Sequence, residues 1–262
     1  MRHRPHTYLF WIQYLGFRYH GWQKQPNLKT IQGRLERVIR YVLGHENFTI
    51  LAAGRTDSGV SCERGAFELF NTAPVEIDAF IRETNKSLPD DIRILSGQAV
   101  GPQFNVIQDV IGKEYRYYFI TGYKPHPFAT ANTLWVDGAL DIEKMKAAAG
   151  LYQGTHDFRR FCTRGKNTEN YTRTIYEADI LPVSGDTYPP EQAFYFKVKG
   201  SGFLMHQVRM MVEALIRIGR GEMEVGMLEE ALSARDDSPL VGKAPAHGLV
   251  LHKVLFDEDK MV

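Results

Sequence analysis

Residues 30–44, TIQGRLERVIRYVLG, lie between two apolar segments and carry hydrophobic residues at helical spacing. Thr30 is of a residue type that caps helix N-termini, and Gly44 is of the type that commonly follows the last turn. The spacing predicts an amphipathic helix, because the apolar residues fall on one stripe. The stripe consists of Ile31, Leu35, Val38, Ile39, Val42 and Leu43.

The segments on both sides of this helix are predicted to be strands. Apolar, β-prone residues precede and follow it, and a second helical segment comes later, ended by Pro89. We expect strands at residues 8–16, 49–53, 65–70 and 92–100, and the second helix at residues 78–88. This order, β-α-β-β-α-β, is that of a split βαβ arrangement of the ferredoxin type.

The second half of the chain repeats these element types without visible sequence repetition. In residues 112–122, GKEYRYYFITG, the side chains of Tyr115, Tyr117 and Phe119 occupy alternate positions. Such alternation is typical of a strand with one buried face. We also expect strands at residues 173–183, 194–203 and 248–256, and helices at residues 141–152, 206–219 and 225–234.

The length suits one large domain or two small ones, and the composition is that of a soluble protein. The order of elements favours two α+β domains, expected at residues 1–105 and 106–262. The 262 residues are 44% hydrophobic and 24% charged, and no apolar run approaches the ~20 residues of a membrane helix. The net charge of +1 does not indicate a nucleic-acid partner. Cys62 and Cys162 lie far apart without metal-ligand spacing, so we expect reduced thiols in a cytoplasmic protein.

The stretch AAGRTDSGV, residues 52–60, follows an apolar strand and ends in turn-forming residues. On propensity, Asp57 is a turn residue that bonds backbone N–H groups. The alternative is a functional carboxylate, because Arg55 offers a charge partner and loops at strand ends commonly carry function. A carboxylate placed in this way would serve as a nucleophile or a general base.

The loop GFRYHGWQKQP, residues 16–26, combines aromatic side chains with hydrogen-bond donors. Tyr19, His20, Trp22, Lys24 and Gln25 follow each other closely there. Exposed aromatics among donors suit unstacked RNA bases, which are recognised by stacking and edge contacts. The alternative is that Tyr19 and Trp22 close the edge of the hydrophobic core.

A second loop, GTHDFRRFCTRGK at residues 154–166, is rich in basic residues. It contains His156, Arg159, Arg160, Arg164 and Lys166. Contacts with phosphate groups and simple solvation of the charges explain this composition equally well. His156 alone is more often a structural residue than a catalyst.

Other chemistry-bearing patterns are few. Arg209 precedes Glu213 by four residues, which is the spacing of a surface ion pair on a helix. Tyr115 by itself is most simply a core aromatic. The sequence has no Walker loop, no GxGxxG motif and no metal-ligand cluster. These residues therefore support one catalytic interpretation, a cofactor-free enzyme that uses a carboxylate.

Several motifs occur in an order and spacing that resemble the tRNA pseudouridine synthase A family. The resemblance covers residues 8–256, nearly the whole chain, and the GRTD-x-GV string is its most specific part. The matching strings are GWQKQP (21–26), TIQGRLERV (30–38), AAGRTDSGV (52–60), SLPDDIRI (87–94), KEYRYYF (113–119), GTHDFRRFC (154–162), TRTIYEADI (172–180), GSGFLMHQVR (200–209), GRG (219–221) and APAHGLVLHKV (244–254).

The resemblance implies an isomerase that converts uridine to pseudouridine in the tRNA anticodon stem-loop, around positions 38–40. It also implies a homodimer whose two subunits jointly bind the tRNA. The fold it implies has two ferredoxin-like halves, whose antiparallel sheets join around a central RNA-binding cleft. The reaction detaches uracil from C1′, rotates it and rejoins it through C5. Nothing is oxidised, so no cofactor is implied.

Particular residues match the family's functional positions. Asp57 matches the catalytic aspartate, and Arg209 matches the arginine that pairs with it and keeps it ionised. Tyr115 matches the tyrosine that stacks on the flipped base, and Arg55 matches a residue that helps to hold the nucleotide out of the stack. The expected RNA contacts also include Trp22, Gln23, Lys24, Gln25, His156, Arg159 and Arg160.

The chain departs from the family pattern at three places. GVSC at residues 59–62 replaces GVHA, and FNVI at residues 104–107 replaces FHAR. Residues 163–175, TRGKNTENYTRTI, look closer to a eukaryotic branch that modifies positions 38 and 39. A subset of uridines such as 38 and 39 is therefore an alternative target.

Two other functions compete with the isomerase. One is a non-catalytic RNA-binding module on the same fold, which has no need of a buried carboxylate. The other is a retaining glycosidase, which requires a second carboxylate ~5–5.5 Å from the first. The sequence offers no second acid in a comparable motif.

Overall fold

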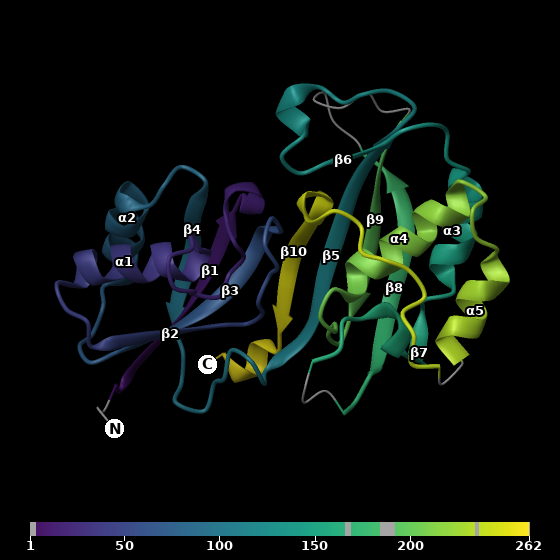
Figure 1. Cartoon of the computed structure of the whole chain (residues 1–262). Helices are drawn as coiled ribbons and strands as arrows, with labels where there is room; N and C mark the ends of the chain where they lie inside the picture. Colours follow the sequence, from purple (N-terminus) through teal and green to yellow (C-terminus); the bar gives the residue numbers. More distant parts are fainter. Residues whose placement is uncertain (1–3, 166–168, 184–191, 234–235, 262) are drawn as a thin grey trace. The chain divides into compact units, whose positions relative to one another are not determined.

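The protein is described by a computed structural model that covers residues 4–165, 169–183, 192–233 and 236–261 (Figure 1). The chain forms two compact units. Unit 1 consists of Met1–Ile111 and Leu251–Val262, and unit 2 consists of Gly112–Val250. The boundaries between the units fall within strands β5 (Val110–Thr121) and β10 (Leu249–Phe256).

Unit 1 has the expected β-α-β-β-α-β order. Strands β4, β1 and β3 lie side by side in that order, and both β2 and β10 (Leu249–Phe256) are neighbours of β3. The β4–β1, β1–β3 and β2–β3 pairs are antiparallel. Figure 1 shows the two helices next to each other on one side of these strands. The elements are β1 (His6–Tyr14), α1 (Ile31–Leu43), β2 (Phe48–Ala52), β3 (Ser61–Asn71), α2 (Ile77–Ser87) and β4 (Ile92–Ala99).

Helix α1 begins and ends as its sequence predicts. The Thr30 side chain accepts a hydrogen bond from the Gly33 backbone N–H at 3.3 Å, which satisfies one of the free donors of the first turn. Gly44 has a φ of 72°, the left-handed conformation that ends many helices. Leu35 and Ile39 on the apolar stripe are fully buried.

Phe10 of β1 lies at the centre of the core of unit 1. Its ring packs against Phe67 of β3, with ring centroids 5.4 Å apart, and against Phe80 of α2 at 5.0 Å. The cross-strand partner of Phe10 in β4 is Gly97. A Cβ at Gly97 would lie 2.3 Å from the Phe10 ring, so only glycine leaves room for this aromatic group.

The strand pairs of unit 2 are mostly antiparallel. Strands β5, β9, β8 and β7 pair in that order, and β6 pairs with β5 in parallel. Figure 1 shows helices α3, α4 and α5 gathered on one side of these strands. The elements not yet defined are β6 (Leu134–Val136), α3 (Ile142–Gly150), β7 (Gly154–Asp157), β8 (Thr172–Pro182), β9 (Ala193–Gly200), α4 (Gln207–Gly219) and α5 (Val225–Ser233).

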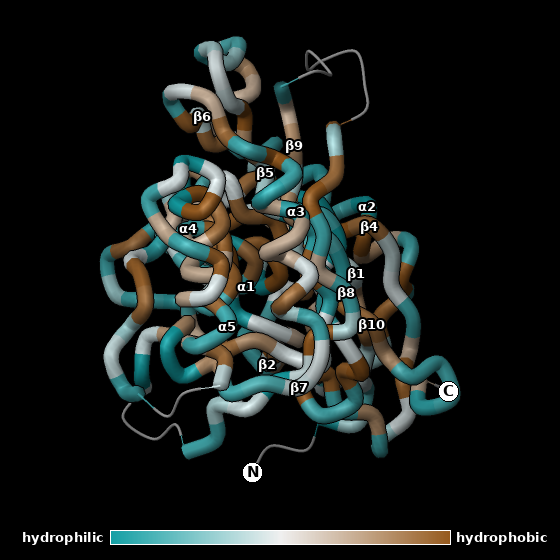
Figure 2. Tube along the Cα trace, turned by 90° about the vertical axis from the view of Figure 1, so that its right-hand side faces the viewer, coloured by the Kyte–Doolittle hydropathy of each residue, from teal (hydrophilic) through white to brown (hydrophobic). Residues whose placement is uncertain are grey.

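Tyr152, which follows α3, anchors the core of unit 2. Its ring packs edge-to-face against Phe161 at 5.6 Å and against Phe196 of β9 at 6.2 Å. Its hydroxyl donates to the Met211 carbonyl oxygen of α4 at 3.0 Å, so this buried polar group is satisfied. Figure 2 shows hydrophobic and hydrophilic residues alternating along the chain, as expected of elements with one buried face.

Side chains attach residues after 105 to unit 1. The buried Glu68 carboxylate accepts the Val106 N–H at 3.0 Å. Lys260 donates to Asp109 at 2.9 Å, and Gln98 donates to the Met261 carbonyl oxygen at 3.4 Å. Residues 106–111 and the chain's last twelve residues, 251–262, therefore belong to unit 1.

Sequence periodicity does not reveal two short strands. Residues 154–157 were expected in a loop, but they form β7, which pairs with β8 from Gly154↔Ile175 to Asp157↔Thr172. Four polar or small residues carry no alternation signal, so their pairing with β8 determines their conformation. Strand β6 has only three residues. In the described ranges of the chain, none of the helices has the length and hydrophobicity required to span a bilayer.

Candidate functional site

Asp57 opens a tight turn that follows β2 in unit 1. The Val60 N–H donates to the Asp57 carbonyl oxygen at 3.1 Å, which closes the four-residue turn. Gly59 has a φ of 82°, and a positive φ at the third position is typical of a type II turn. Asp57 is half-buried and Arg55 is exposed. The propensity of the sequence for a turn here is confirmed, and we call residues 57–60 the Asp57 turn.

The loop of residues 16–22, the supporting loop, braces this turn through backbone groups. The Gly59 N–H donates to the Tyr19 carbonyl oxygen at 3.0 Å, and the Trp22 N–H donates to the Thr56 carbonyl oxygen at 3.1 Å. The Ser61 hydroxyl accepts the Gly16 N–H at 2.9 Å. Unit 1 therefore fixes the backbone on both sides of Asp57.

A glycine makes this close approach possible. Gly21 has a φ of 83°, and a Cβ there would lie 2.7 Å from the Thr56 carbonyl oxygen. A side chain at this position would thus clash with the segment that carries Asp57 and would also strain the backbone. The structure explains the Gly21–Trp22 pair of the sequence. Gly21 adopts the positive φ, and the Trp22 backbone N–H donates a hydrogen bond to Thr56.

The four residues of the GWQKQP motif proposed to contact RNA have different environments. Trp22 is buried and its ring packs against Tyr14, with ring centroids 6.1 Å apart. Lys24 pairs with Glu36 of α1 at 2.6 Å. Gln23 and Gln25 are exposed. The polar residues of the motif, and not its indole, are therefore at the surface of unit 1.

Tyr19 is also part of the scaffold of unit 1. Its hydroxyl donates to the Asp91 carboxylate at 2.5 Å, and the Lys29 ammonium lies 4.6 Å from the ring centroid. Burial, followed by the bond to Asp91, raises the pKa of Tyr19 well above its usual range. The phenol therefore stays protonated at neutral pH and keeps this bond.

Tyr115 and Arg209 lie in unit 2. Tyr115 is buried in β5, on the same face as Tyr117, and its ring meets Phe203 edge-to-face at 5.2 Å. Arg209, in the first turn of α4, donates from Nε to the Ala244 carbonyl oxygen at 2.8 Å. The Ala244 N–H in turn donates to the Arg209 carbonyl oxygen at 3.1 Å. These contacts fix the segment before β10 onto α4.

The same segment is held against β5 as well. The Tyr117 hydroxyl donates to the Pro245 carbonyl oxygen at 2.7 Å, and a Cβ at Gly248 would lie 2.7 Å from the Tyr117 ring. Burial raises the pKa of Tyr117, so its hydroxyl remains a donor. Glu213 pairs with Arg217 at 3.0 Å, which is an i,i+4 pair within α4. The APAHG string thus ties α4 to β5.

His156 is a structural residue of β7. Its Nε2 makes a hydrogen bond of 2.8 Å with the Gln153 carbonyl oxygen, and its ring packs edge-to-face against Phe158 at 6.0 Å. A Cβ at Gly154 would lie 3.2 Å from the same Nε2 atom. Within unit 2, His156 thus fixes the turn that leads into the edge strand.

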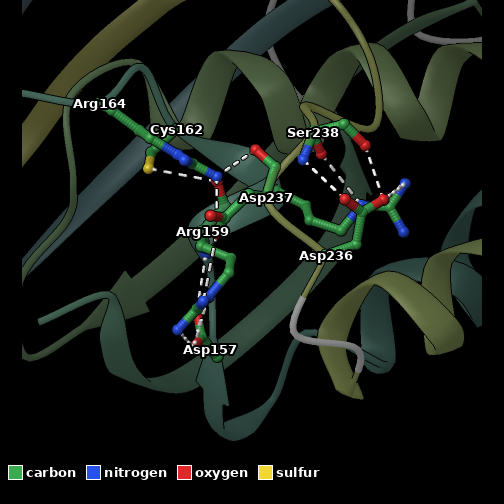
Figure 3. A network of polar contacts seen from close by, with 8 residues as sticks. Asp157, Arg159, Cys162, Arg164, Asp236, Asp237 and Ser238 are labelled. Carbon is green, nitrogen blue, oxygen red and sulfur yellow. Dashed lines mark hydrogen bonds and ion pairs between the residues drawn. The ribbon is translucent and has the colours of Figure 1, made fainter.

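The arginines that follow β7 form ion pairs with aspartates about 75 residues later in the sequence (Figure 3). We call residues 157–164 the arginine loop and residues 236–238 the aspartate segment. Arg159 pairs with Asp157 at 2.8 Å and with Asp237 at 3.2 Å. Arg164 pairs with Asp237 at 2.8 Å. Lys166, the last basic residue of the sequence motif, lies outside the described residues.

Arg160 completes this network. It pairs with Asp236 at 3.6 Å and donates to the Ser238 carbonyl oxygen at 3.1 Å. The pKa of Asp236 is lowered, first by the hydrogen bonds from Ser238 and then by the charge of Arg160. The positive charge of the arginine loop is thus matched by carboxylates, which the local sequence around residues 154–166 gives no reason to expect.

The structure places the proposed catalytic residues on three elements. Asp57 lies in the Asp57 turn of unit 1, and Tyr115 and Arg209 lie in β5 and α4 of unit 2. Among the residues that the structure describes, no group of three or more His, Cys, Asp or Glu side chains could hold a metal ion. Sequence reasoning missed the Thr56 side chain, whose oxygen lies 2.8 Å from the Tyr14 hydroxyl, and the aspartate segment, because their partners lie far away in the sequence.

Comparisons with known proteins assign the chain to a family. A family model described as tRNA pseudouridine synthase matches residues 148–257. A protein of Exiguobacterium sibiricum named tRNA pseudouridine synthase A is 33% identical over 95% of this chain and 96% of its own length. The chain belongs to the tRNA pseudouridine synthase A family. Members from Staphylococcus saprophyticus and Thermotoga sp. (strain RQ2) are 33% and 34% identical, over 96% and 94% of this chain and 91% and 97% of their own lengths.

Proposed function

We propose that this protein is a tRNA pseudouridine synthase that isomerises uridine in the anticodon stem-loop, with Asp57 as nucleophile. Membership of the tRNA pseudouridine synthase A family supports the reaction. The observation that carries the residue assignment is the position of Asp57. It is a half-buried carboxylate at the head of a turn whose backbone is fixed on both sides. A preorganised carboxylate of this kind suits attack on an electrophilic carbon.

The reaction needs no external reactant. The N1–C1′ bond of the target uridine breaks and a C5–C1′ bond forms, while N1 gains a proton and C5 loses one. Asp57 attacks either C1′, forming a glycosyl ester, or the uracil base, forming an adduct. Either route ends with the carboxylate released unchanged. We therefore expect an isomerase that works without a cofactor.

Tyr115 and Arg209 are proposed to complete the catalytic site. Arg209 would keep the Asp57 carboxylate ionised, since a neighbouring guanidinium favours the charged form. Tyr115 would stack on the flipped uracil and assist proton transfer. Arg55, which is exposed beside Asp57, would hold the nucleotide out of the helical stack. This proposal implies that the sheets of two ferredoxin-like halves join around a central RNA-binding cleft.

The tRNA contacts are proposed at both units. In unit 1 the exposed Gln23, Lys24 and Gln25 are available to the substrate, whereas Trp22 supports them from the core. In unit 2 we propose contacts from Arg159 and Arg160, with His156 shaping the turn before them. The target uridines are positions 38–40 or the subset 38 and 39. We further propose that the protein acts in the cytoplasm as a homodimer.

Release of tritium from C5-labelled uridine in tRNA transcripts tests the reaction, because C5 loses its hydrogen only when the new bond forms. The wild type is expected to release tritium, and Asp57→Ala is expected to release none while it still binds tRNA. Asp90→Ala, at an exposed carboxylate of unit 1, is the matched control and should retain activity. A fully active Asp57→Ala variant would contradict the nucleophile. A wild type inactive on every anticodon-arm uridine would contradict the function.

A further inference from the structure

A buried pair of hydroxyl groups includes the side chain of Thr56, the residue that precedes Asp57. The Tyr14 hydroxyl at the end of β1 and the Thr56 side-chain oxygen are 2.8 Å apart. Only 4% of Tyr14 and 8% of Thr56 is exposed. We propose that this hydroxyl pair is a positioning device that sets the direction of the Asp57 carboxylate. The proposal rests on the catalytic role of Asp57 argued above.

The pair acts at the residue that precedes Asp57 in the chain. The Thr56 carbonyl oxygen, which belongs to the Thr56–Asp57 peptide unit, accepts the Trp22 N–H at 3.1 Å. The Thr56 side chain is held by Tyr14. With both groups bonded, Thr56 cannot rotate about its backbone without breaking a hydrogen bond. The direction in which the next side chain leaves the backbone is fixed as a result.

Tyr14 is itself held in place on its other sides. Its ring packs against the indole of Trp22, with centroids 6.1 Å apart, and its hydroxyl also bonds the thiol of Cys62 in β3. Burial raises the pKa of the Cys62 thiol to about 12, so that the thiol stays neutral at physiological pH. A Cβ at Gly65 would lie 2.7 Å from the Cys62 sulfur, so the thiol has little room to move.

Packing alone does not explain these hydroxyl groups. Valine has nearly the shape of threonine, and phenylalanine has nearly the shape of tyrosine, so apolar residues would fill the same space. A buried hydroxyl is unfavourable unless it is hydrogen-bonded, and then it contributes direction as well as volume. The network uses uncharged groups only, and hence it adds no competing charge beside the Asp57 carboxylate.

The rest of the turn has its own support. Gly59 and Ser58 donate to the Tyr19 carbonyl oxygen at 3.0 and 3.3 Å, and Ser61 accepts from Gly16. Loss of the Thr56 hydroxyl therefore leaves the turn closed and the tRNA surface unchanged. The expected defect lies in the rate of the chemical step and not in substrate binding.

The test compares Thr56→Val, Thr56→Ser, Tyr14→Phe and the double variant Tyr14→Phe/Thr56→Val with the wild type. For each, the single-turnover rate of tritium release, the Kd for the tRNA transcript and the thermal midpoint are measured. Thr84→Val is the matched control, since Thr84 is a fully buried threonine of α2 in the same unit. It is expected to react at the wild-type rate.

We expect Thr56→Val to react about 10- to 100-fold more slowly, because displacements of about 1 Å at a reacting group have effects of this size. Its tRNA Kd should remain within about 2-fold of the wild type, and Thr56→Ser should restore the rate. In the double variant neither hydroxyl remains, and the Cys62 thiol keeps the Ile12 carbonyl oxygen as its acceptor at 3.8 Å. The thermal midpoint should therefore recover relative to the single variants. The rate should stay low, which a purely structural role does not predict.

Two results would overturn the proposal. One is a Thr56→Val variant with the wild-type rate, and the other is a double variant whose rate recovers together with its thermal midpoint. These outcomes are separable from failure of the proposed function. If Asp57→Ala is inactive and Thr56→Val is fully active, the positioning role fails alone. If Asp57→Ala is fully active, the catalytic assignment fails first.

Discussion

The Asp57 turn and the arginine loop both carry charged residues, but the two regions are held by different forces. The turn is braced by uncharged groups, through backbone bonds to Tyr19 and Trp22 and the buried Tyr14–Thr56 pair. The arginine loop is held by ion pairs between Arg159, Arg160 and Arg164 and the aspartate segment. Exposed ion pairs are screened by salt and exchange readily with solvent, whereas buried neutral bonds do not.

This difference indicates different tasks. A reacting carboxylate must keep one position within a fraction of an ångström, and short-range bonds from a packed scaffold provide such rigidity. If the arginine loop binds RNA phosphates, as we propose, its arginines must change partners when RNA arrives, and a carboxylate at the surface is a partner that phosphate can replace. We infer that the protein uses rigid support in unit 1 and exchangeable contacts in unit 2.

The largest expected effect comes from lengthening the Asp57 side chain by one methylene group, and the same change at Asp237 is its comparison. Asp57→Glu keeps the charge but moves the carboxylate by about 1.5 Å, and the braced turn cannot compensate, so we expect a rate loss of about 100-fold or more. Asp237→Glu makes the same change in the aspartate segment, where the Asp237 side chain is 66% exposed and has room to adjust. Its single-turnover rate of tritium release should stay within about 2-fold of the wild type. Equal effects at the two positions would show that the regions do not differ in rigidity.

The next largest effect concerns the approach of the supporting loop to the Asp57 turn. A Cβ at Gly16 would lie 1.9 Å from the Val60 carbonyl oxygen, a backbone atom that cannot move aside cheaply. We expect Gly16→Ala to lower the free energy of unfolding by about 1–3 kcal/mol and to reduce activity. A Cβ at Gly226 in α5 would meet no heavy atom of another part of the chain within 4 Å, so Gly226→Ala is the control.

Gly226→Ala should be neutral or stabilise the protein by roughly 0.5–1 kcal/mol, because alanine restricts the unfolded chain more than glycine does. Chemical denaturation of both variants measures the difference. A Gly16→Ala variant as stable as the wild type would mean that the supporting loop can withdraw from the turn. The Asp57 turn would then lack the rigidity that distinguishes it from the arginine loop.

Local patterns in the sequence were sufficient where neighbouring residues decide the structure. The Thr30 cap and Gly44 stop of α1 are confirmed, and so is the alternation of Tyr115, Tyr117 and Phe119 in β5. In each case the determining contacts lie within one element or one turn of the chain. The order of elements in unit 1 followed from the same kind of evidence.

The sequence could not predict contacts that depend on residues brought together from far apart. The Tyr14–Thr56 bond joins residues 42 positions apart, and Arg159 meets Asp237 across 78 positions. Strand β7 exists because β8 pairs with it, and its four residues show no periodicity of their own. The family resemblance assigned a role to Asp57, but it did not reveal what holds the turn in place.

The smallest expected effect tests whether the aspartate segment competes with RNA for the arginine loop. The double variant Asp236→Asn/Asp237→Asn removes the two carboxylates of the aspartate segment that pair with Arg159, Arg160 and Arg164 without changing side-chain size. Asp157 still pairs with Arg159 in this variant. If phosphate replaces these aspartates, tRNA should bind about 3- to 10-fold more tightly. The dependence of log Kd on log salt should steepen by about 1 for each additional phosphate contact.

The control for this prediction must remove the same number of negative charges at another place on the protein. Glu83→Gln/Glu143→Gln also removes two exposed carboxylates, which pair with Lys86 on α2 and Lys146 on α3. Measured across a salt series, the control should change the tRNA Kd only slightly, since general attraction between the protein and RNA falls off within the Debye length of ~10 Å at 0.1 M salt. Equal tightening in both double variants would indicate a general charge effect. Weaker binding in the Asp236→Asn/Asp237→Asn variant would show that the ion pairs hold the arginine loop in its tRNA-binding conformation.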